Sequence, residues 1–98
     1  MIIKWLSTKP GTITIRERKT AHIPHYKVLL HNDDANTMEY VVIALMRVFG
    51  LERKQCERIM LEAHNSGVSR CTIESLEQAE HHRDQLISLT LITTIEPV

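Results

Sequence analysis

The segment from residue 38 to residue 49 restricts the fold most strongly, because its apolar residues all fall on one side of a helix. They recur at intervals of three and four, which is the spacing of neighbours on a helical face. The residues of this stripe are Met38, Val41, Val42, Leu45 and Phe49. Thr37 is a suitable N-cap for this helix and Gly50 a suitable stop. A helix with one apolar stripe has to pack on another layer, which the rest of the chain must supply.

The remaining segments alternate between strand-like and helix-like patterns. The predicted strands are residues 26–31, 68–73 and 89–95. A second helix is predicted over residues 52–65, and a third begins after the capping box of Ser75 and Gln78. Their inward residues are Cys56, Ile59, Met60 and Ala63 in the second helix and Leu76, Ala79, Leu86 and Ile87 in the third. The order β-α-α-β-α-β predicts an α+β fold, with three helices packed against a three-stranded antiparallel sheet.

The charge of the chain is unevenly distributed over its 98 residues, a length that suits one domain. Residues 1–27 carry six basic and one acidic residue, a net charge of +5, whereas residues 28–98 carry six basic and eleven acidic residues, a net charge of −5. Because the whole chain is neutral, we expect neither a nucleic-acid partner nor an anionic membrane. The prediction is a mobile basic arm over residues 1–25, with a short edge strand at 12–15 as the alternative, and a folded domain over residues 26–98.

Neither secretion nor membrane insertion is indicated by the pattern of apolar residues. The apolar run at residues 1–6 is too short for the core of a signal peptide, and no stretch approaches the ~18 apolar residues of a membrane span. Cys56 and Cys71 lie fifteen residues apart without a CxxC pairing. We therefore expect free thiols and a cytoplasmic protein.

Polar residues concentrate at the end of the first predicted strand. Asn32, Asp33 and Asp34 follow it directly, and His64 lies beside the apolar face of the second helix. Two carboxylates and an amide offer acceptors that suit a cation with several N–H donors, such as an ammonium. The same side chains can instead cap the following helix, and His64 can be a structural residue at a helix end. From the residues alone both interpretations stay open.

Other chemistries have less support in the sequence. His31, Asp33 and His64 lack the spacing of a metal site, and the adjacent His81 and His82 would diverge by about 100° on a helix. Neither a cysteine nor a serine lies in a nucleophile motif, and the three separated glycines form no phosphate-binding loop. The residues therefore predict a binding domain rather than an enzyme, with no cofactor and no metal.

Three stretches of the chain carry a more specific pattern. They are YKVLLHNDD at Tyr26–Asp34, MEYV at Met38–Val41 and MLEAHNSG at Met60–Gly67. Together they closely resemble the ClpS family, the adaptors of the Clp ATP-dependent protease, and the resemblance runs from about Tyr26 to Ile95. It implies a protein without enzymatic activity that recognises destabilising N-terminal residues, bulky hydrophobic or aromatic, on substrate proteins. The adaptor delivers these substrates to a ClpA-type or ClpC-type unfoldase.

The resemblance also implies a role for individual residues. The substrate's α-amino group and adjoining backbone would be held by Asn32, Asp33, Asp34 and His64. The hydrophobic pocket for the first side chain would be lined by Met38, Val41, Met60, Ala63 and Leu91. The unfoldase would be contacted by Glu77, Glu80 and His82 of the third helix, while the arm before Tyr26 engages its pore. We expect a monomer in the cytoplasm, or in the plastid stroma if the chain comes from a plant.

The chain departs from the family pattern at a few positions. Many members have valine where Ala63 stands, so the pocket should be wider, and a lysine is common where this chain has His82. Thr37 replaces a frequent proline, with little expected effect because the helix cap is kept. Asn36 and Thr37 resemble members from cyanobacteria and plastids, which pair with a ClpC-type partner. The alternative function is a regulator that binds the unfoldase and inhibits or redirects the protease without recognising N-terminal residues.

Overall fold

The computed structural model describes residues 24–98, which form three strands and three helices in the predicted order. In chain order these are β1 (His25–His31), α1 (Met38–Phe49), α2 (Arg53–Ser66), β2 (Val68–Ser75), α3 (Leu76–Ser88) and β3 (Thr93–Pro97). The α+β fold is thereby confirmed. The predicted basic arm of residues 1–25, with its alternative edge strand, falls on residues that lie outside the described range, apart from its last two. One of these two, His25, begins β1.

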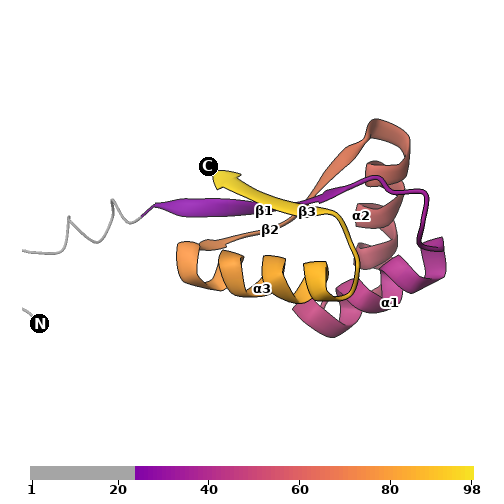
Figure 1. Ribbon diagram of the computed structural model, residues 1–98, viewed down its shortest axis with the longest axis horizontal. Coiled ribbons are helices and arrows are strands. Elements are labelled where there is room, and N and C mark those ends of the chain that lie inside the picture. The colour runs from indigo at the N-terminus through magenta and orange to yellow at the C-terminus, as the bar shows by residue number, and fades with distance from the viewer. Residues whose placement is uncertain (1–23) are drawn as a thin grey trace, which may run out of the picture.

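The three strands form one antiparallel sheet in the order β2-β1-β3 (Figure 1). Side chains of β1 alternate between the two faces, and Val28 and Leu30 are buried on the helical side. A bulge between Val28 and Leu29 shifts the pairing with β2. In space α3 packs across all three strands, α2 packs on β1 and β2, and α1 packs on the other two helices. No helix within residues 24–98 is long and apolar enough to cross a membrane.

One hydrophobic core joins the helices to the sheet. Its most deeply buried side chains are Val28, Leu30, Val42, Leu45, Cys56, Ala79, Leu86 and Leu91. Cys56 and Cys71 are both buried and free, as predicted. Burial raises the pKa of the Cys71 thiol to about 12, so this group stays protonated and is a poor nucleophile. Two residues of α3 that were predicted to face inward, Leu76 and Ile87, are 42% and 50% exposed.

The ends of the helices lie where the capping residues predicted them. The hydroxyl of Thr37 accepts a hydrogen bond from the backbone N–H of Tyr40 at 3.1 Å, and Ser75 accepts one from Gln78 at 3.4 Å. At the other end of α1, Gly50 adopts a left-handed backbone with φ of 69° and donates its N–H to the carbonyl of Met46. Local sequence therefore determines where α1 begins and where it ends.

The third strand is shorter than predicted, since residues 89–90 form a turn, residues 91–92 have no regular structure and only Thr93–Pro97 are a strand. The backbone N–H of Leu89 donates to the carbonyl oxygens of Gln85 and Leu86 and thus closes α3. Thr90 then turns the chain with φ of 70°, a conformation that costs a β-branched residue about 1–3 kcal/mol. Helix termination therefore overrides the high β-propensity of this segment.

We predict that Gly50→Ala lowers the free energy of unfolding by about 1 kcal/mol, measured by urea denaturation. An added Cβ would meet no atom within 4 Å, so the loss would come from the left-handed φ and not from a clash. Gly50→Asn is the control, because asparagine tolerates this backbone better and should lose less stability. An asparagine variant that is as unstable as the alanine variant would contradict this explanation.

Candidate functional site

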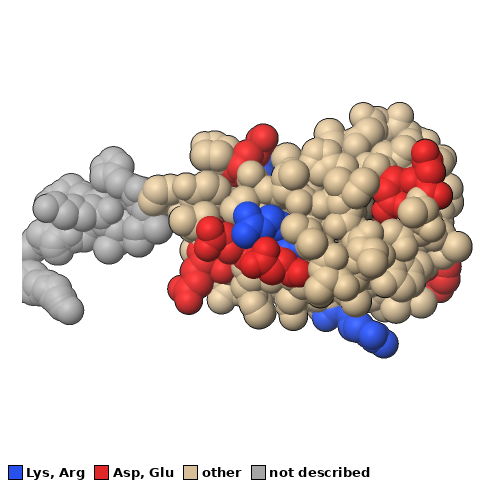
Figure 2. All heavy atoms as spheres, viewed as in Figure 1, with Lys and Arg blue, Asp and Glu red and all other residues tan. Residues whose placement is uncertain are grey.

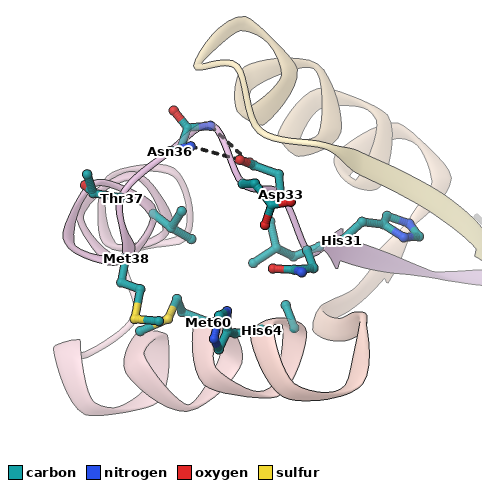
Figure 3. A pocket seen from close by; sticks show the side chains of 12 residues that line it. His31, Asp33, Asn36, Thr37, Met38, Met60 and His64 are labelled. Carbon is teal, nitrogen blue, oxygen red and sulfur yellow. Dashed lines mark hydrogen bonds between the residues drawn. The ribbon is translucent and has the colours of Figure 1, made fainter.

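A cavity of about 290 Å³ lies between the β1–α1 loop, the start of α1 and the second half of α2. This volume is at the lower limit of the ~300–1,000 Å³ that is common for small-molecule sites, so the cavity suits a group of the size of one amino-acid residue better than a large ligand. Figure 3 shows the side chains that line it. They are Leu30, His31, Asn32, Asp33, Asp34, Asn36, Thr37, Met38, Val41, Met60, Ala63 and His64. The structure thus brings both halves of the predicted site, the polar turn and His64, to one cavity.

The carboxylate of Asp33 organises the β1–α1 loop. Its Oδ1 accepts hydrogen bonds from the backbone N–H groups of Ala35, at 2.7 Å, and Asn36, at 2.9 Å. Its Oδ2 accepts a third hydrogen bond from the side-chain amide of Asn36, at 3.0 Å. Asp33 therefore satisfies backbone donors of the loop that precedes the helix, whereas the helix itself is capped by Thr37 and not by Asp33 as the capping interpretation expected.

These bonds also keep Asp33 charged. Desolvation alone would raise the pKa of this carboxyl, but the hydrogen bond from the Asn36 side chain and those from the Asn36 and Ala35 backbone lower it below its ordinary value. Hydrogen bonds donated to a carboxylate favour its ionised form. A negative charge with a fixed direction therefore stands at the polar side of the cavity.

His64 and Asn32 complete the polar part of the site. Figure 3 shows His64, near the end of α2, on the opposite side of the cavity from Asp33. The backbone N–H of Asn32 donates to the carbonyl of Gly67 at 3.0 Å, which fixes the loop beside the end of α2. Among residues 24–98 no hydrogen bond occupies the side chain of Asn32 or of His64. Both side chains therefore retain an acceptor for a ligand.

The other polar candidates are arranged differently. Asp34 lines the cavity but is exposed and, within the described residues, accepts no hydrogen bond. The ring of His31 points away from the cavity in Figure 3, and its Nε2 lies 2.7 Å from the hydroxyl of Thr94. His31, Asp33 and His64 therefore do not converge on one point. In residues 24–98 no three side chains of His, Cys, Asp or Glu are grouped to hold a metal ion.

An apolar wall stands beside these polar groups. Four of the five residues predicted for the hydrophobic pocket line the cavity, namely Met38, Val41, Met60 and Ala63. Leu91 is not among the lining residues: it follows the turn at Thr90, donates its N–H to the carbonyl of Leu86 and is buried in the core. Leu30, which the sequence predicted only as part of a strand, lines the cavity in its place. Thioether side chains adapt their shape, so the wall can accept apolar groups of different form.

Asn36 is the site residue that sequence reasoning did not identify. Its Nδ2 donates to Asp33 and also to the carbonyl of Thr90 at 3.0 Å, and its Oδ1 lies 3.3 Å from the hydroxyl of Thr90. The two residues are 54 positions apart in the chain. A local motif cannot reveal a contact over such a separation, although the position of Asn36 in the polar turn marked it as a loop residue.

The residues predicted to contact an unfoldase lie on α3. Glu77 and Glu80 are exposed, and Figure 2 shows acidic side chains gathered over this helix. His82 differs from them, because its Nδ1 lies 2.8 Å from Oε1 of Glu74 and its ring packs edge-on against Phe49 with 4.9 Å between the centroids. With a side-chain exposure of 20%, His82 mainly joins α3 to β2 and α1.

This combination of groups limits the ligands that the cavity can hold. An ionised carboxylate, an amide oxygen and an imidazole nitrogen are acceptors that suit a cationic N–H donor. The apolar wall suits a hydrocarbon or aromatic group attached close to that donor. In residues 24–98 both cysteines are buried, and no serine or threonine hydroxyl lines the cavity except that of Thr37, which caps α1. The described site thus offers acceptors for a cationic donor beside an apolar wall.

Comparison with known proteins agrees with the resemblance seen in the sequence. Residues 21–91 match the family model of the ATP-dependent Clp protease adaptor protein ClpS. The ATP-dependent Clp protease adapter protein ClpS of Prochlorococcus marinus is 42% identical over 97% of this chain and 95% of its own length. Its counterpart from Synechococcus elongatus is 48% identical over 91% of this chain and 90% of its own length. Both of these relatives come from cyanobacteria.

A solved structure supports the same relationship. The structure of Agrobacterium tumefaciens ClpS2 bound to L-phenylalaninamide superposes with a TM-score of 0.76 and is 29% identical in sequence. The superposition covers 79% of this chain and the whole of that chain.

We predict that Asp33→Asn destabilises the protein by about 1 kcal/mol at pH 7, because an amide NH₂ would face the donors that now bond the carboxylate. The lowered pKa means that folding favours the ionised form. The contribution of the Asp33 carboxylate to the free energy of unfolding is therefore fully present above its ordinary pKa of 3.8. It is lost as the pH falls through the lower pKa of the folded state.

Urea denaturation of both proteins at pH 7 and in steps below pH 3.8 measures this difference. Asp34→Asn is the matched control, since Asp34 makes no hydrogen bond within the described residues and should show little change at any pH. A stability difference for Asp33→Asn that stays constant down to the lowest pH would contradict the role of the ionised carboxylate.

Proposed function

This chain belongs to the ClpS family of ATP-dependent Clp protease adaptors, and on that premise we propose that it binds the N-terminal residue of substrate proteins. It has no enzymatic activity of its own in this proposal. Its ligand is a free α-ammonium together with a bulky hydrophobic or aromatic first side chain. After binding, the adaptor delivers the substrate to a ClpA-type or ClpC-type unfoldase, in the cytoplasm or in a plastid stroma, and acts as a single copy.

The observation that carries this proposal is the opposition of Asp33 and His64 across one cavity with an apolar wall (Figure 3). A carboxylate offers about four lone-pair positions, and Asp33 uses three of them within its own loop. It therefore offers the ligand one hydrogen bond and a full negative charge. The side chains of Asn32 and His64 can each accept one more, which gives three acceptors for the three N–H bonds of an ammonium.

The apolar wall explains why a bulky first residue is favoured. Binding removes the apolar surface of the side chain from water, which contributes about 25 cal/mol per Å², so a phenylalanine or leucine gains more than an alanine. Ala63 is buried in this wall and has a small side chain, which leaves room beside Met60. The bound phenylalaninamide of the Agrobacterium protein supports an aromatic preference for this chain as well.

We predict that a fluorescein-labelled peptide with a free N-terminal phenylalanine binds, and that its N-acetylated form binds at least about 100-fold more weakly. Acetylation removes the charge and two of the three donors, so acceptors in the site remain unpaired, at a cost of about 1–3 kcal/mol each. Fluorescence anisotropy measures both dissociation constants. Equal affinities for the two peptides would contradict recognition of the α-amino group.

Variants of α2 show in the same assay whether His64 has a functional role or a structural one. His64→Ala should weaken binding of the free peptide while circular dichroism shows an unchanged fold, because the imidazole makes no hydrogen bond within residues 24–98. Asn65→Ala is the matched control, since Asn65 follows on the same helix and does not line the cavity. An unfolded His64→Ala protein would support the structural interpretation instead.

Delivery requires a second surface, and we assign it to α3. Glu77 and Glu80 are exposed on this helix, away from the cavity, so that a partner can bind there while the site is occupied. His82 contributes indirectly in this proposal, because its bond to Glu74 and its packing on Phe49 hold the helix in place.

We predict that Glu77→Ala and Glu80→Ala slow degradation of a reporter with an N-terminal phenylalanine by the complete unfoldase and protease, without changing the affinity for the free peptide. Glu52→Ala, which removes an exposed acid from the start of α2, is the control. If the wild-type chain slows degradation of the reporter instead of accelerating it, the protein is a regulator that inhibits the protease rather than an adaptor.

A further inference from the structure

We propose that Asn36 is a positioning residue of this site, which aims the carboxylate of Asp33 at the ligand by anchoring it to the α3–β3 turn. The inference rests on the proposed recognition of a free α-amino group and extends it to a residue that does not need to touch the ligand. Leu89 and Thr90 do not line the cavity, but in this proposal the turn that they form influences how tightly the cavity binds its ligand.

The geometry of Asn36 supports this role directly. Its backbone N–H bonds Oδ1 of Asp33 at 2.9 Å, while its Nδ2 bonds Oδ2 at 3.0 Å, so both oxygens of the carboxylate are held by one residue. Two contacts to separate oxygens fix the plane of a carboxylate, whereas a single contact leaves it free to rotate. The orientation of Asp33 therefore depends on where Asn36 itself is held.

Thr90 holds the amide of Asn36 from the other side. The second N–H of Nδ2 donates to the backbone carbonyl of Thr90 at 3.0 Å, while the Thr90 hydroxyl lies 3.3 Å from Oδ1 and has its nearer acceptor, at 2.5 Å, in the carbonyl of Leu89. Because a primary amide has two donors, both are now used, and the side chain cannot turn without losing bonds. The amide thus joins the β1–α1 loop to a turn that is distant in the sequence.

The turn is a firm anchor for this connection. Leu89 is tied to the end of α3 by its N–H bonds to Gln85 and Leu86, and its carbonyl accepts a hydrogen bond from the hydroxyl of Tyr40 at 2.8 Å. Thr90 persists with a positive φ of 70°, a conformation that a non-glycine residue keeps only where the surroundings enforce it. Tyr40 belongs to α1, so the turn is bonded both to the end of α3 and to the helix that follows the polar loop.

The test compares Asn36→Ala and Asn36→Asp with the wild-type chain in binding of the free phenylalanine peptide. Asn36→Ala should raise Kd about tenfold through loss of the oriented charge-assisted bond. Asn36→Asp should raise it further, because its carboxylate repels that of Asp33 and cannot donate. Asn65→Ala, the same substitution outside the cavity, should leave Kd unchanged.

The pH dependence of binding separates positioning from simple stability. Loss of the Asn36 donor raises the pKa of Asp33, so the step of the acidic limb that comes from Asp33 should move to higher pH in Asn36→Ala, whereas the step that comes from protonation of His64, which removes its acceptor, should stay in place. The other titratable groups that line the same cavity are Asp34 on the loop, His31 of β1 and His64 of α2, and all are unchanged in the variant. The alkaline limb, which the α-amino group of the peptide determines, should stay in place.

The results that would overturn the proposal are distinct from those that would overturn the proposed function. If the wild-type chain binds the peptide and Asn36→Ala matches it in Kd and in pH profile, Asn36 has no positioning role. If the wild-type chain binds no peptide, the proposed function itself fails. Should both variants unfold, NMR titration of the wild-type protein decides: the side-chain amide protons of Asn36 must shift with the ionisation of Asp33, and their failure to do so refutes the connection.

Discussion

The site depends on the bonds that the Asp33 carboxylate makes within its own loop. Three donors from Ala35 and Asn36 satisfy most of its lone pairs and keep it ionised, and Asp33 is at the same time one of the residues that line the cavity. A capping residue and a ligand-binding residue are usually considered alternatives for such a position. In the proposed function Asp33 does both, because a carboxylate has more acceptor positions than a tight loop uses. The charge that organises the loop is thus the one that we propose for binding the ligand.

The fold places an apolar wall next to this charge without any additional structural element. Met38 and Val41 lie at the start of α1, directly after the polar loop, whereas Met60 and Ala63 face them from α2. The two helices pack on each other, so the cavity between their ends requires no insertion or extra domain. A chain of 98 residues can thus hold a cavity of about 290 Å³ beside an intact core.

Sequence patterns predicted the elements well wherever the signal was local. Thr37 and Gly50 marked the ends of α1 correctly, because capping depends on residues within one turn of the helix. The start of β3 was placed four residues too early, since the hydrogen bonds that close α3 outweigh β-propensity there. Leu91 was expected in the pocket and lies instead in the core, because the turn at Thr90 redirects the chain before it.

The sequence by itself determined the chemistry of the site: an acidic polar turn, a histidine beside an apolar helix face, and the family to which they belong. Only the tertiary structure decided which of these groups share a cavity and how they are held. In the folded protein His31 contacts Thr94, His82 pairs with Glu74, and the side chain of Asn36 donates to the carbonyl of Thr90. The physical reason is that composition and periodicity report on neighbours along the chain. A hydrogen bond across 54 positions exists only once the sheet and helices have packed.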